Sequence, residues 1–370
     1  MKLIVLFSML LMSCGGEVSA FAGVSEAGEE VTDVSVENFC GSMDGCVDSY
    51  PFVRQDSTAS ATQRVLEKYS CAPSTNEGGP ERVIPVSIPE SGLFIASVEG
   101  GAPGVDVDVH LLSAPDAKDC LIRGDKDVAM WVQPGLYYVA VDTYVDSAGK
   151  ERAGEYTLNL DFHSPKRWAV HGISAPVAQR ALHAFSVAWS RKETSSLDYT
   201  VIDFHRASSE PRMWVFDLRS TTPVQALLVA HGSGSNPGPD PSRATAFSNI
   251  SESHQSSLGM MRTGESYYGS FGFSMKLDGL EEKFNGRVRD RHVVVHGADW
   301  ASPEFLARAG TLGQSWGCPT VDDKAIKPLI KRLRGGSLMF SDYPDPEWLA
   351  ESEYLPMESE CTQAVACSMR

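Results

Sequence analysis

The sequence lacks the features that mark several large classes of protein. Beyond the first dozen residues no apolar run is long enough to cross a bilayer, and no repeat of solenoid length occurs. The 370 residues carry 32 Lys and Arg against 48 Asp and Glu, a formal net charge of −16. This balance argues against nucleic acid or an anionic membrane surface as a partner. The length suits two domains.

Motifs for zinc and phosphate are also missing. His292, His296 and Cys318 could be combined into a zinc site, but no His-Glu-x-x-His or His-x-His pattern accompanies them. Zinc cysteines also tend to come with further cysteines nearby. The glycine-rich stretch HGSGSNPG precedes no expected helix, which argues against a phosphate loop. We therefore predict no metal and no cofactor.

A calcium site is a further possibility that the sequence does not favour. Asp106, Asp108 and His110 alternate with valines in VDVDVHLL, so they share one face of an expected strand. No glycine-bounded calcium loop accompanies them. We interpret this acidic face as solvated rather than as a ligand set.

The N-terminus has the pattern of an export signal. Residues 1–13 contain Lys2 and a short apolar run that ends at Ser13, directly before Cys14. This ending resembles a bacterial lipoprotein cleavage site and implies a lipid on Cys14, whereas plain cleavage after Ala20 is the alternative. Residues 14–37 are small and acidic, as a flexible tether would be. We expect a protein on the periplasmic face of the cell envelope, anchored by lipid to the membrane, the outer membrane being our preferred choice.

Export implies an oxidising compartment, where cysteines commonly form disulfides. With Cys14 assigned to lipid and Cys318 left free, six cysteines remain, and six allow fifteen pairings. The preferred pairs are Cys40–Cys46, Cys71–Cys120 and Cys361–Cys367. The last pair would close a local loop in a C-terminal tail of residues 346–370.

Strand signals dominate both expected domains, and the predicted fold class is mainly β. Residues 38–162 contain six short alternating or β-branched runs, which predict an antiparallel β-sandwich. These runs are RVIPVSI, GLFIASVEG, VDVDVHLLS, VAMWVQ, LYYVAVDTY and EYTLNLDF. Residues 163–345 begin with an amphipathic helix, SAPVAQRALHAFSVAWSRK, and continue with strands and short helices. We predict a β-rich domain with peripheral helices. The negative charge of the protein is concentrated in residues 15–162, which hold 25 Asp and Glu against 9 Lys and Arg. The second domain is therefore nearly neutral.

One cysteine and one histidine in the second domain form a candidate catalytic pair. The β-branched run RHVVVHG delivers His296 to the end of a strand, next to Gly297, where backbone can approach a substrate closely. Cys318 follows Gly317, so their two amides could serve as oxyanion donors, and Pro319 stiffens the turn. A thiolate that attacks a carbonyl needs a proton acceptor, oxyanion donors and a rigid position. The alternative is a buried, inert thiol or a disulfide partner.

The strings VVVHGADW and LGQSWGCPTV resemble the catalytic signature of the YkuD-like L,D-transpeptidases, a His-Gly followed by Ser/Thr-His-Gly-Cys. The run from ALLVAHGSGS to RHVVVHGA is similar to the murein L,D-transpeptidase branch, over about residues 170–343. The resemblance implies that His296 is the general base and Cys318 the acylated nucleophile, with Gly317 and Cys318 supplying the oxyanion amides. Ser315 matches the Ser/Thr of the motif.

That family acts on peptidoglycan. The resemblance implies attack on a stem tetrapeptide, release of D-alanine, and transfer of the acyl group to an amine, which gives a 3→3 cross-link or attaches a protein. The same pair would also suit an L,D-carboxypeptidase or an amidase that hydrolyses murein peptides, and a non-catalytic wall-binding lipoprotein is the alternative from another class. Trp316 departs from the motif, where a second histidine is usual, and offers a flat apolar wall beside the nucleophile.

The first domain carries a second resemblance. The segments DVDVHLL, PGLYYVAVDTY and GEYTLNLDF are similar to bacterial pre-peptidase C-terminal domains over roughly residues 70–162. This resemblance implies an accessory sandwich without catalytic residues. Neither resemblance indicates an oligomeric state.

Several polar residues are candidates for contact with the stem peptide. His231 lies at an expected strand end, and Asn249 and Ser257 lie in a serine-rich stretch. Each could line the pocket or stabilise a turn by hydrogen bonds.

Basic residues precede the strand that carries His296. Arg287, Arg289 and Arg291 alternate on its expected approach and so could share one face, either toward stem-peptide carboxylates or, as we favour, toward solvent. His292, four residues before His296, would then lie on the same strand face.

Overall fold

The computed structural model describes residues 38–355. The predicted lipid site at Cys14, the acidic tether up to Glu37, and the predicted pair Cys361–Cys367 lie outside this range. None of the helices within it is long and apolar enough to cross a membrane.

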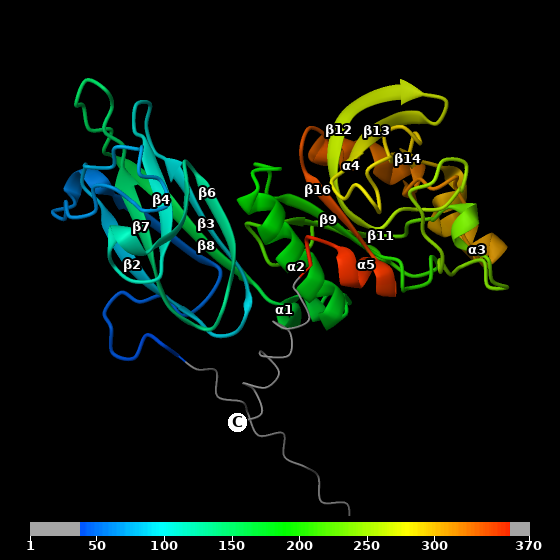
Figure 1. Cartoon of the computed structure of the whole chain (residues 1–370), viewed down its shortest axis with the longest axis horizontal. Coiled ribbons are helices and arrows are strands. Elements are labelled where there is room, and N and C mark those ends of the chain that lie inside the picture. The colour runs from blue at the N-terminus through cyan, green and yellow to red at the C-terminus, as the bar shows by residue number, and fades with distance from the viewer. Residues whose placement is uncertain (1–37, 356–370) are drawn as a thin grey trace, which may run out of the picture. The chain divides into compact units, whose positions relative to one another are not determined.

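The N-terminal part forms a mainly antiparallel β-sandwich (Figure 1). One sheet has the order β1-β8-β3-β6 and the other the order β2-β7-β4-β5. Valine, leucine and phenylalanine side chains from both sheets, such as Val86 and Phe94, form the core between them. The strands are β1 Phe52–Ser57, β2 Arg82–Ile88, β3 Gly92–Gly100, β4 Val107–Leu112, β5 Cys120–Gly124, β6 Asp127–Val132, β7 Gly135–Thr143 and β8 Glu155–His163.

Two predicted disulfides are confirmed in this part of the chain. Cys40 bonds to Cys46, and Cys71 bonds to Cys120 at the start of β5. The second bridge closes a long segment and ties the chain before β2 to the β4–β5 turn.

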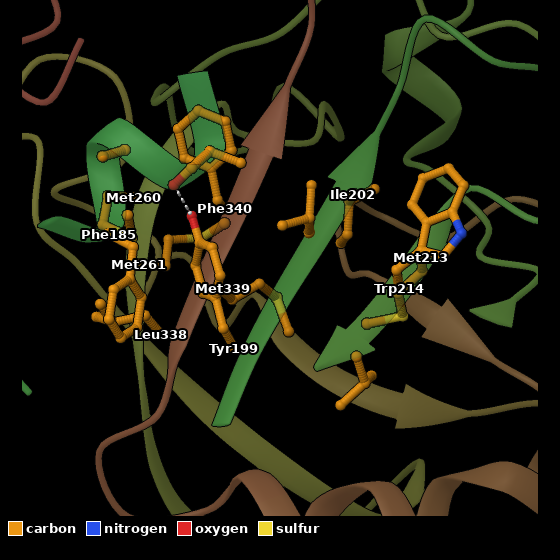
Figure 2. Close-up of a cluster of buried hydrophobic side chains, with 14 of the residues drawn as sticks. Phe185, Tyr199, Ile202, Met213, Trp214, Met260, Met261, Leu338, Met339 and Phe340 are labelled. Atoms are coloured by element: carbon orange, nitrogen blue, oxygen red, sulfur yellow. Dashed lines mark hydrogen bonds between the residues drawn. The ribbon is translucent and has the colours of Figure 1, made fainter. Parts of the chain in front are cut away.

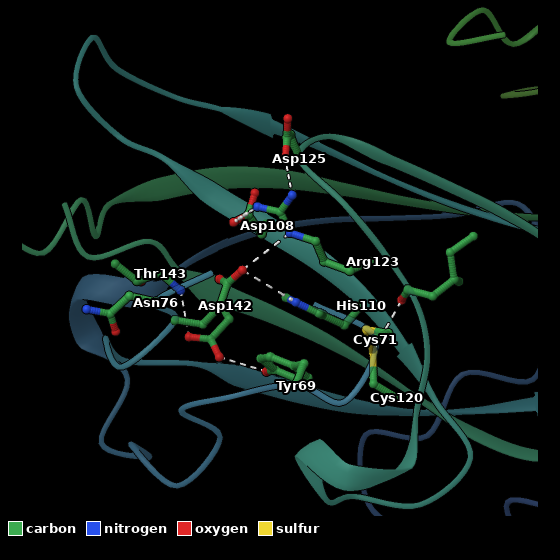
Figure 3. A network of polar contacts seen from close by, with 12 residues as sticks. Tyr69, Cys71, Asn76, Asp108, His110, Cys120, Arg123, Asp125, Asp142 and Thr143 are labelled. Carbon is green, nitrogen blue, oxygen red and sulfur yellow. Dashed lines mark hydrogen bonds and ion pairs between the residues drawn. A yellow bond between two sulfur atoms is a disulfide. The ribbon is translucent and has the colours of Figure 1, made fainter. Parts of the chain in front are cut away.

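The interpretation of this acidic face as solvated is wrong for Asp108 and His110, whereas Asp106, which precedes β4, is exposed. Asp108 and His110 are 1% and 0% exposed. In Figure 3, Arg123 of β5 lies beside Asp108, to which it donates at 2.6 Å. Tyr69 covers the imidazole of His110 with ring centroids 3.7 Å apart and donates its hydroxyl to Asp142 at 2.7 Å. This polar face is buried because the segment before β2 covers it with Tyr69 and Glu77, while β5 supplies the charged partner Arg123.

The C-terminal part is built on one eight-stranded sheet with the order β11-β10-β9-β16-β12-β13-β14-β15. Most neighbours are antiparallel, but β16 pairs with β9 and β14 with β15 in parallel. The strands are β9 Asp198–Asp203, β10 Met213–Asp217, β11 Gln225–Leu227, β12 Gly259–Gly269, β13 Gly272–Gly279, β14 Val294–Gly297, β15 Thr320–Val321 and β16 Leu338–Asp342. The helices are α1 Pro165–Ala169, α2 Ala175–Ser190, α3 Pro303–Ala309, α4 Asp323–Leu333 and α5 Pro346–Glu351. The mainly β fold is therefore confirmed.

The predicted helix at the start of this part is confirmed as α2, and it packs on the sheet. Its apolar residues recur at helical spacing, and Phe185 is buried against Tyr199 of β9 with ring centroids 4.9 Å apart. Figure 2 shows the hydroxyl of Tyr199 reaching the helix, where it donates to the Ala181 carbonyl at 2.8 Å. On another part of the sheet, α4 packs against β13 and β14 and so supports the strand that carries His296.

The segment before β14 is a series of turns and not the expected strand approach. His292 has a left-handed backbone conformation, φ 56°, and the strand begins only at Val294. His292 and His296 therefore do not share a strand face. Arg287, Arg289 and Arg291 do not share one either, because turns rotate their side chains into different surroundings.

Candidate active site

Two short parallel strands bring the Cys318 turn to His296. β14 pairs with β15 in parallel, with His296 opposite Thr320, and Cys318 lies two residues before Thr320. Cys318 forms no disulfide and is 6% exposed. Its Sγ accepts a hydrogen bond from the Val294 amide at 3.4 Å and lies 3.8 Å from the His292 carbonyl oxygen. The loop–strand junction before His296 thus contacts the sulfur directly.

The surroundings of the Cys318 thiol act on its pKa in opposite directions. Burial raises the pKa of Cys318 above that of a free thiol, and the Val294 amide and the positive charge of Arg291 offset only part of this rise. A hydrogen bond from an amide favours the charged form of an acceptor, so the same contact that fixes the sulfur also favours the thiolate.

The imidazole of His296 has a fixed tautomer. Its Nδ1 lies 3.0 Å from the Gly297 carbonyl oxygen, which can only accept, so Nδ1 carries the hydrogen. In the neutral ring Nε2 then has the lone pair, and it lies 3.0 Å from the Oγ1 of Thr320. Burial lowers the pKa of His296. The ring is therefore neutral at neutral pH and suited to accept a proton at Nε2.

Aromatic rings flank the His296 imidazole. Phe271, from the turn between β12 and β13, stacks on it with ring centroids 4.6 Å apart, although Phe271 is itself 58% exposed. Trp300 meets the imidazole edge-on at 6.3 Å. These contacts restrict the ring to the orientation that the Gly297 carbonyl selects.

The turn before Cys318 is held by the Ser315 hydroxyl. Ser315 Oγ donates to the Cys318 carbonyl at 2.7 Å and accepts from the Gly317 amide at 3.2 Å. Of the two amides expected to bind an oxyanion, that of Gly317 is therefore engaged here. The Cys318 amide has no hydrogen-bond partner among residues 38–355. Gly317 has φ +110°, and a Cβ there would lie 2.7 Å from the Gln255 carbonyl oxygen, so only glycine fits.

The site therefore combines the free thiol of Cys318, a neutral imidazole on β14, and a Cys318 amide that has no partner among residues 38–355. Residues 170–342 match the family model of the L,D-transpeptidase catalytic domain, YkuD_2. These residues belong to that family of catalytic domains. A comparison with curated proteins gives no match.

Among solved structures, this chain is similar to the pre-peptidase C-terminal domain of a collagenase from Bacillus anthracis. The identity is 13%, the match covers 31% of this chain and 94% of the other, and the TM-score is 0.21. It is also similar to PliG from Aeromonas hydrophila, a periplasmic inhibitor of g-type lysozyme. There the identity is 11%, the coverage is 32% and 96%, and the TM-score is 0.21.

In the L,D-transpeptidase domain, Trp316 occupies the position of the usual second histidine and is 72% exposed. One face of its indole stacks on His254, with ring centroids 4.8 Å apart and the planes nearly parallel at 4°. The other face has no aromatic neighbour among the described residues. The exposed indole thus offers a flat apolar surface two residues before Cys318, and its predicted role as a wall for the substrate stays a prediction.

His231 lies behind the Ser315 turn. It is 1% exposed, its Nδ1 lies 2.9 Å from an Nη2 of Arg212, and its backbone carbonyl accepts from the Ser315 amide at 3.0 Å. Burial, with a smaller effect of Arg212, lowers its pKa to about 3. In this structure His231 supports the turn through hydrogen bonds, which was the alternative to lining the pocket.

Asn249 and Ser257 likewise make contacts within the protein. The Asn249 side chain donates to the Glu282 carbonyl at 2.8 Å and accepts from the Arg287 amide at 2.9 Å. Ser257 is 3% exposed and accepts from Arg291 at 2.7 Å. Both residues hold the loop of residues 248–257 against the turns before β14.

Two residues near the site were missed by the sequence analysis. Thr320, two residues after the cysteine, was not singled out. Its hydroxyl reaches His296 because β15 pairs in parallel with β14, which places Thr320 opposite His296. Arg291 was assigned to a solvated face, but its guanidinium turns inward to the 248–257 loop. Within residues 38–355, no group of three His, Cys, Asp or Glu side chains is placed to hold a metal ion.

Proposed function

We propose that the C-terminal domain is a cell-wall L,D-transpeptidase whose nucleophile is Cys318. The thiolate attacks the carbonyl between the L-centre and the terminal D-alanine of a peptidoglycan stem tetrapeptide. D-alanine leaves, a thioester to Cys318 remains, and an amine of a second stem takes the acyl group. The observation that carries the proposal is the free thiol of Cys318, held by the Val294 amide in a domain of this family.

His296 moves the protons in this proposal. Nε2 accepts the thiol proton and gives it to the leaving amine of D-alanine, then takes a proton from the incoming amine. The Thr320 hydroxyl lies 3.0 Å from Nε2 and must release this nitrogen before it can accept the thiol proton. The hydroxyl then donates to the Cys318 carbonyl oxygen, which is 3.3 Å away. General-base assistance of this kind typically contributes about 10²–10⁴ in rate.

The Cys318 amide stabilises the oxyanion that forms during attack. It belongs to the nucleophile itself and has no partner within residues 38–355. Loss of one such donor typically costs about 10²–10³ in kcat. The Gly317 amide contributes as a second donor only after it leaves the Ser315 hydroxyl, from which it is 3.2 Å away.

The test is incubation of the whole protein with a disaccharide-tetrapeptide and product analysis by mass spectrometry. Transpeptidation gives a cross-linked dimer with loss of one D-alanine. Tripeptide alone would replace the proposal by an L,D-carboxypeptidase, in which water resolves the thioester. Cys318→Ala and His296→Gln should lose the product, whereas His171→Gln, a change of histidine outside the site, should keep it. Unchanged substrate with folded wild-type protein would contradict the proposal.

We also propose that the protein is attached to the periplasmic face of the envelope through lipid on Cys14. The support is the sequence Leu11-Met12-Ser13-Cys14 at the end of a short apolar run. Labelling of cells with a radioactive fatty acid should mark the wild-type protein and not Cys14→Ala. Equal labelling of both, or of neither, would contradict the anchor and leave the catalytic proposal untouched.

A further inference from the structure

Arg291 is held by uncharged hydrogen-bond acceptors. Its Nη1 donates to the Ser248 carbonyl at 2.6 Å and to Ser257 Oγ at 2.7 Å. Its Nη2 donates to the Gln255 carbonyl at 2.6 Å and to Ser253 Oγ at 3.2 Å. All four acceptors are neutral. The guanidinium is thus fixed in place without its charge being neutralised.

No carboxylate within residues 38–355 forms an ion pair with Arg291. Two residues earlier, Arg289 differs from Arg291, because it pairs with both Asp278 and Glu265. A partly buried charge costs free energy unless an opposite charge compensates it. Burial accordingly lowers the pKa of Arg291. An anion beside Arg291 would remove this cost.

Arg291 adjoins the Cys318 turn both through its side chain and through the backbone that follows it. Arg291 Nη2 is 3.5 Å from the position that a Cβ on Gly317 would occupy, directly before Cys318 in the chain. The sulfur itself contacts the carbonyl of His292 and the amide of Val294, which follow Arg291. The guanidinium and the thiol therefore share one small region of backbone.

The other titratable side chains around the thiol contact different partners, and Arg287, whose charge acts on Arg291, donates to Ser251 Oγ at 3.2 Å. His296 is neutral, since burial lowers its pKa, and its Nε2 faces Thr320. His292 contacts the sulfur through its backbone carbonyl. His254 stacks on Trp316, and the nearby Asp323 acts on His296 and not on Cys318.

We propose that Arg291 is the electrostatic partner that stabilises the Cys318 thiolate. His296 then acts as a neutral proton acceptor and does not form an imidazolium–thiolate ion pair in the resting enzyme. This inference rests on Cys318 being the nucleophile of the proposed function. An opposite charge a few ångströms away typically lowers a pKa by about 1–3 units.

The test is a pH titration of thiolate absorbance at 240 nm on the whole, disulfide-intact protein. The spectrum of Cys318→Ser is subtracted at each pH, which isolates Cys318 from the tyrosines and from any other free cysteine. Arg291→Gln keeps a hydrogen-bonding side chain without the charge, and Arg291→Lys keeps the charge without the forked donors. Arg289→Gln is the matched control, since it removes an arginine that is already paired. Circular dichroism checks that each variant is folded.

We expect Arg291→Gln to raise the Cys318 midpoint by about one pH unit or more, a roughly tenfold lower thiolate fraction below the midpoint. Arg291→Lys and Arg289→Gln should stay close to the wild type. An unchanged midpoint in Arg291→Gln, or an equal rise in Arg291→Lys, would overturn the inference.

His296→Gln provides an independent arm that does not disturb the 248–257 loop. We expect its Cys318 midpoint to remain near that of the wild type, because the imidazole is neutral. A rise of about a unit would assign the thiolate to an imidazolium partner and contradict the role of Arg291. The titration uses no murein substrate, so its failure is distinguishable from failure of the proposed function.

Discussion

Ser315→Ala isolates the hydroxyl that holds the Cys318 turn. The change removes a single oxygen from a side chain that is 6% exposed, so it leaves almost no cavity. It also removes the 2.7 Å bond to the Cys318 carbonyl and leaves the Gly317 amide without an acceptor. A buried donor left unsatisfied costs about 1–3 kcal/mol. We expect the free energy of unfolding to fall by about 2 kcal/mol, which lowers the Tm by about 4–8 °C.

The activity of Ser315→Ala should fall further than its stability suggests. The Gly317–Cys318 segment is free to move by a fraction of an ångström once its inner hydrogen bonds are gone, and a misplacement of about 1 Å can cost about 10² in rate. Calorimetry and the rate of D-alanine release measure the two effects separately. Ser315→Thr, which keeps the hydroxyl, is the control. Wild-type activity and a Tm within about 1 °C in Ser315→Ala would refute this reasoning.

Two further changes test other parts of the account. Gly317→Ala places a Cβ 2.7 Å from the Gln255 carbonyl oxygen, at a residue whose φ is +110°. We therefore expect the variant to lose D-alanine release while circular dichroism shows that it is still folded. Retained activity would contradict the tight turn. In the sandwich, burial raises the pKa of Asp142 to about 9, so the folded state keeps a proton that the unfolded chain releases near pH 4. The stability that this proton contributes is full below about pH 4 and is lost as the pH rises through about 9. Asp142→Asn stays neutral, and its Tm relative to the wild type should therefore rise from pH 5 to pH 9; a constant difference would show that Asp142 is ionised in the fold.

The strands of the sandwich could be predicted well where the side chains alternate. All six predicted runs are strands, but β1 and β5 were missed. β1, FVRQDS, has mostly polar, exposed side chains and lies at a sheet edge, so it carries no apolar pattern. β5 is short and begins at the disulfide cysteine Cys120. Alternation of apolar and polar residues reveals a strand only where one face of the strand is buried. Neither β1 nor β5 buries much of either face.

The burial of the polar face of β4 could not be predicted from its own sequence. Alternation places Asp108 and His110 on one face, but what covers that face comes from residues far away in the chain. Tyr69 and the loop around it are fixed by the Cys71–Cys120 bridge. The alternation therefore predicts which residues share a face of the strand, but not what covers that face.

In the C-terminal part, the motif alone pointed to Cys318 and His296 as the candidate catalytic pair, because one cysteine turn and one strand-end histidine carry the resemblance. The groups around that pair depend on tertiary contacts. Thr320 faces His296 through parallel strand pairing, and Arg291 turns inward because turns replace the expected strand before Val294. Neither effect leaves a periodic signal in the sequence.

The most direct test of the central claim is intact-protein mass spectrometry after brief exposure to the murein tetrapeptide. The account predicts an adduct with the mass of the tetrapeptide less D-alanine, mapped by peptide analysis to Cys318 and absent from Cys318→Ala. His296→Gln should form the same adduct far more slowly. Turnover of the substrate with an adduct on another residue, or an adduct that persists in Cys318→Ala, would contradict Cys318 as the nucleophile.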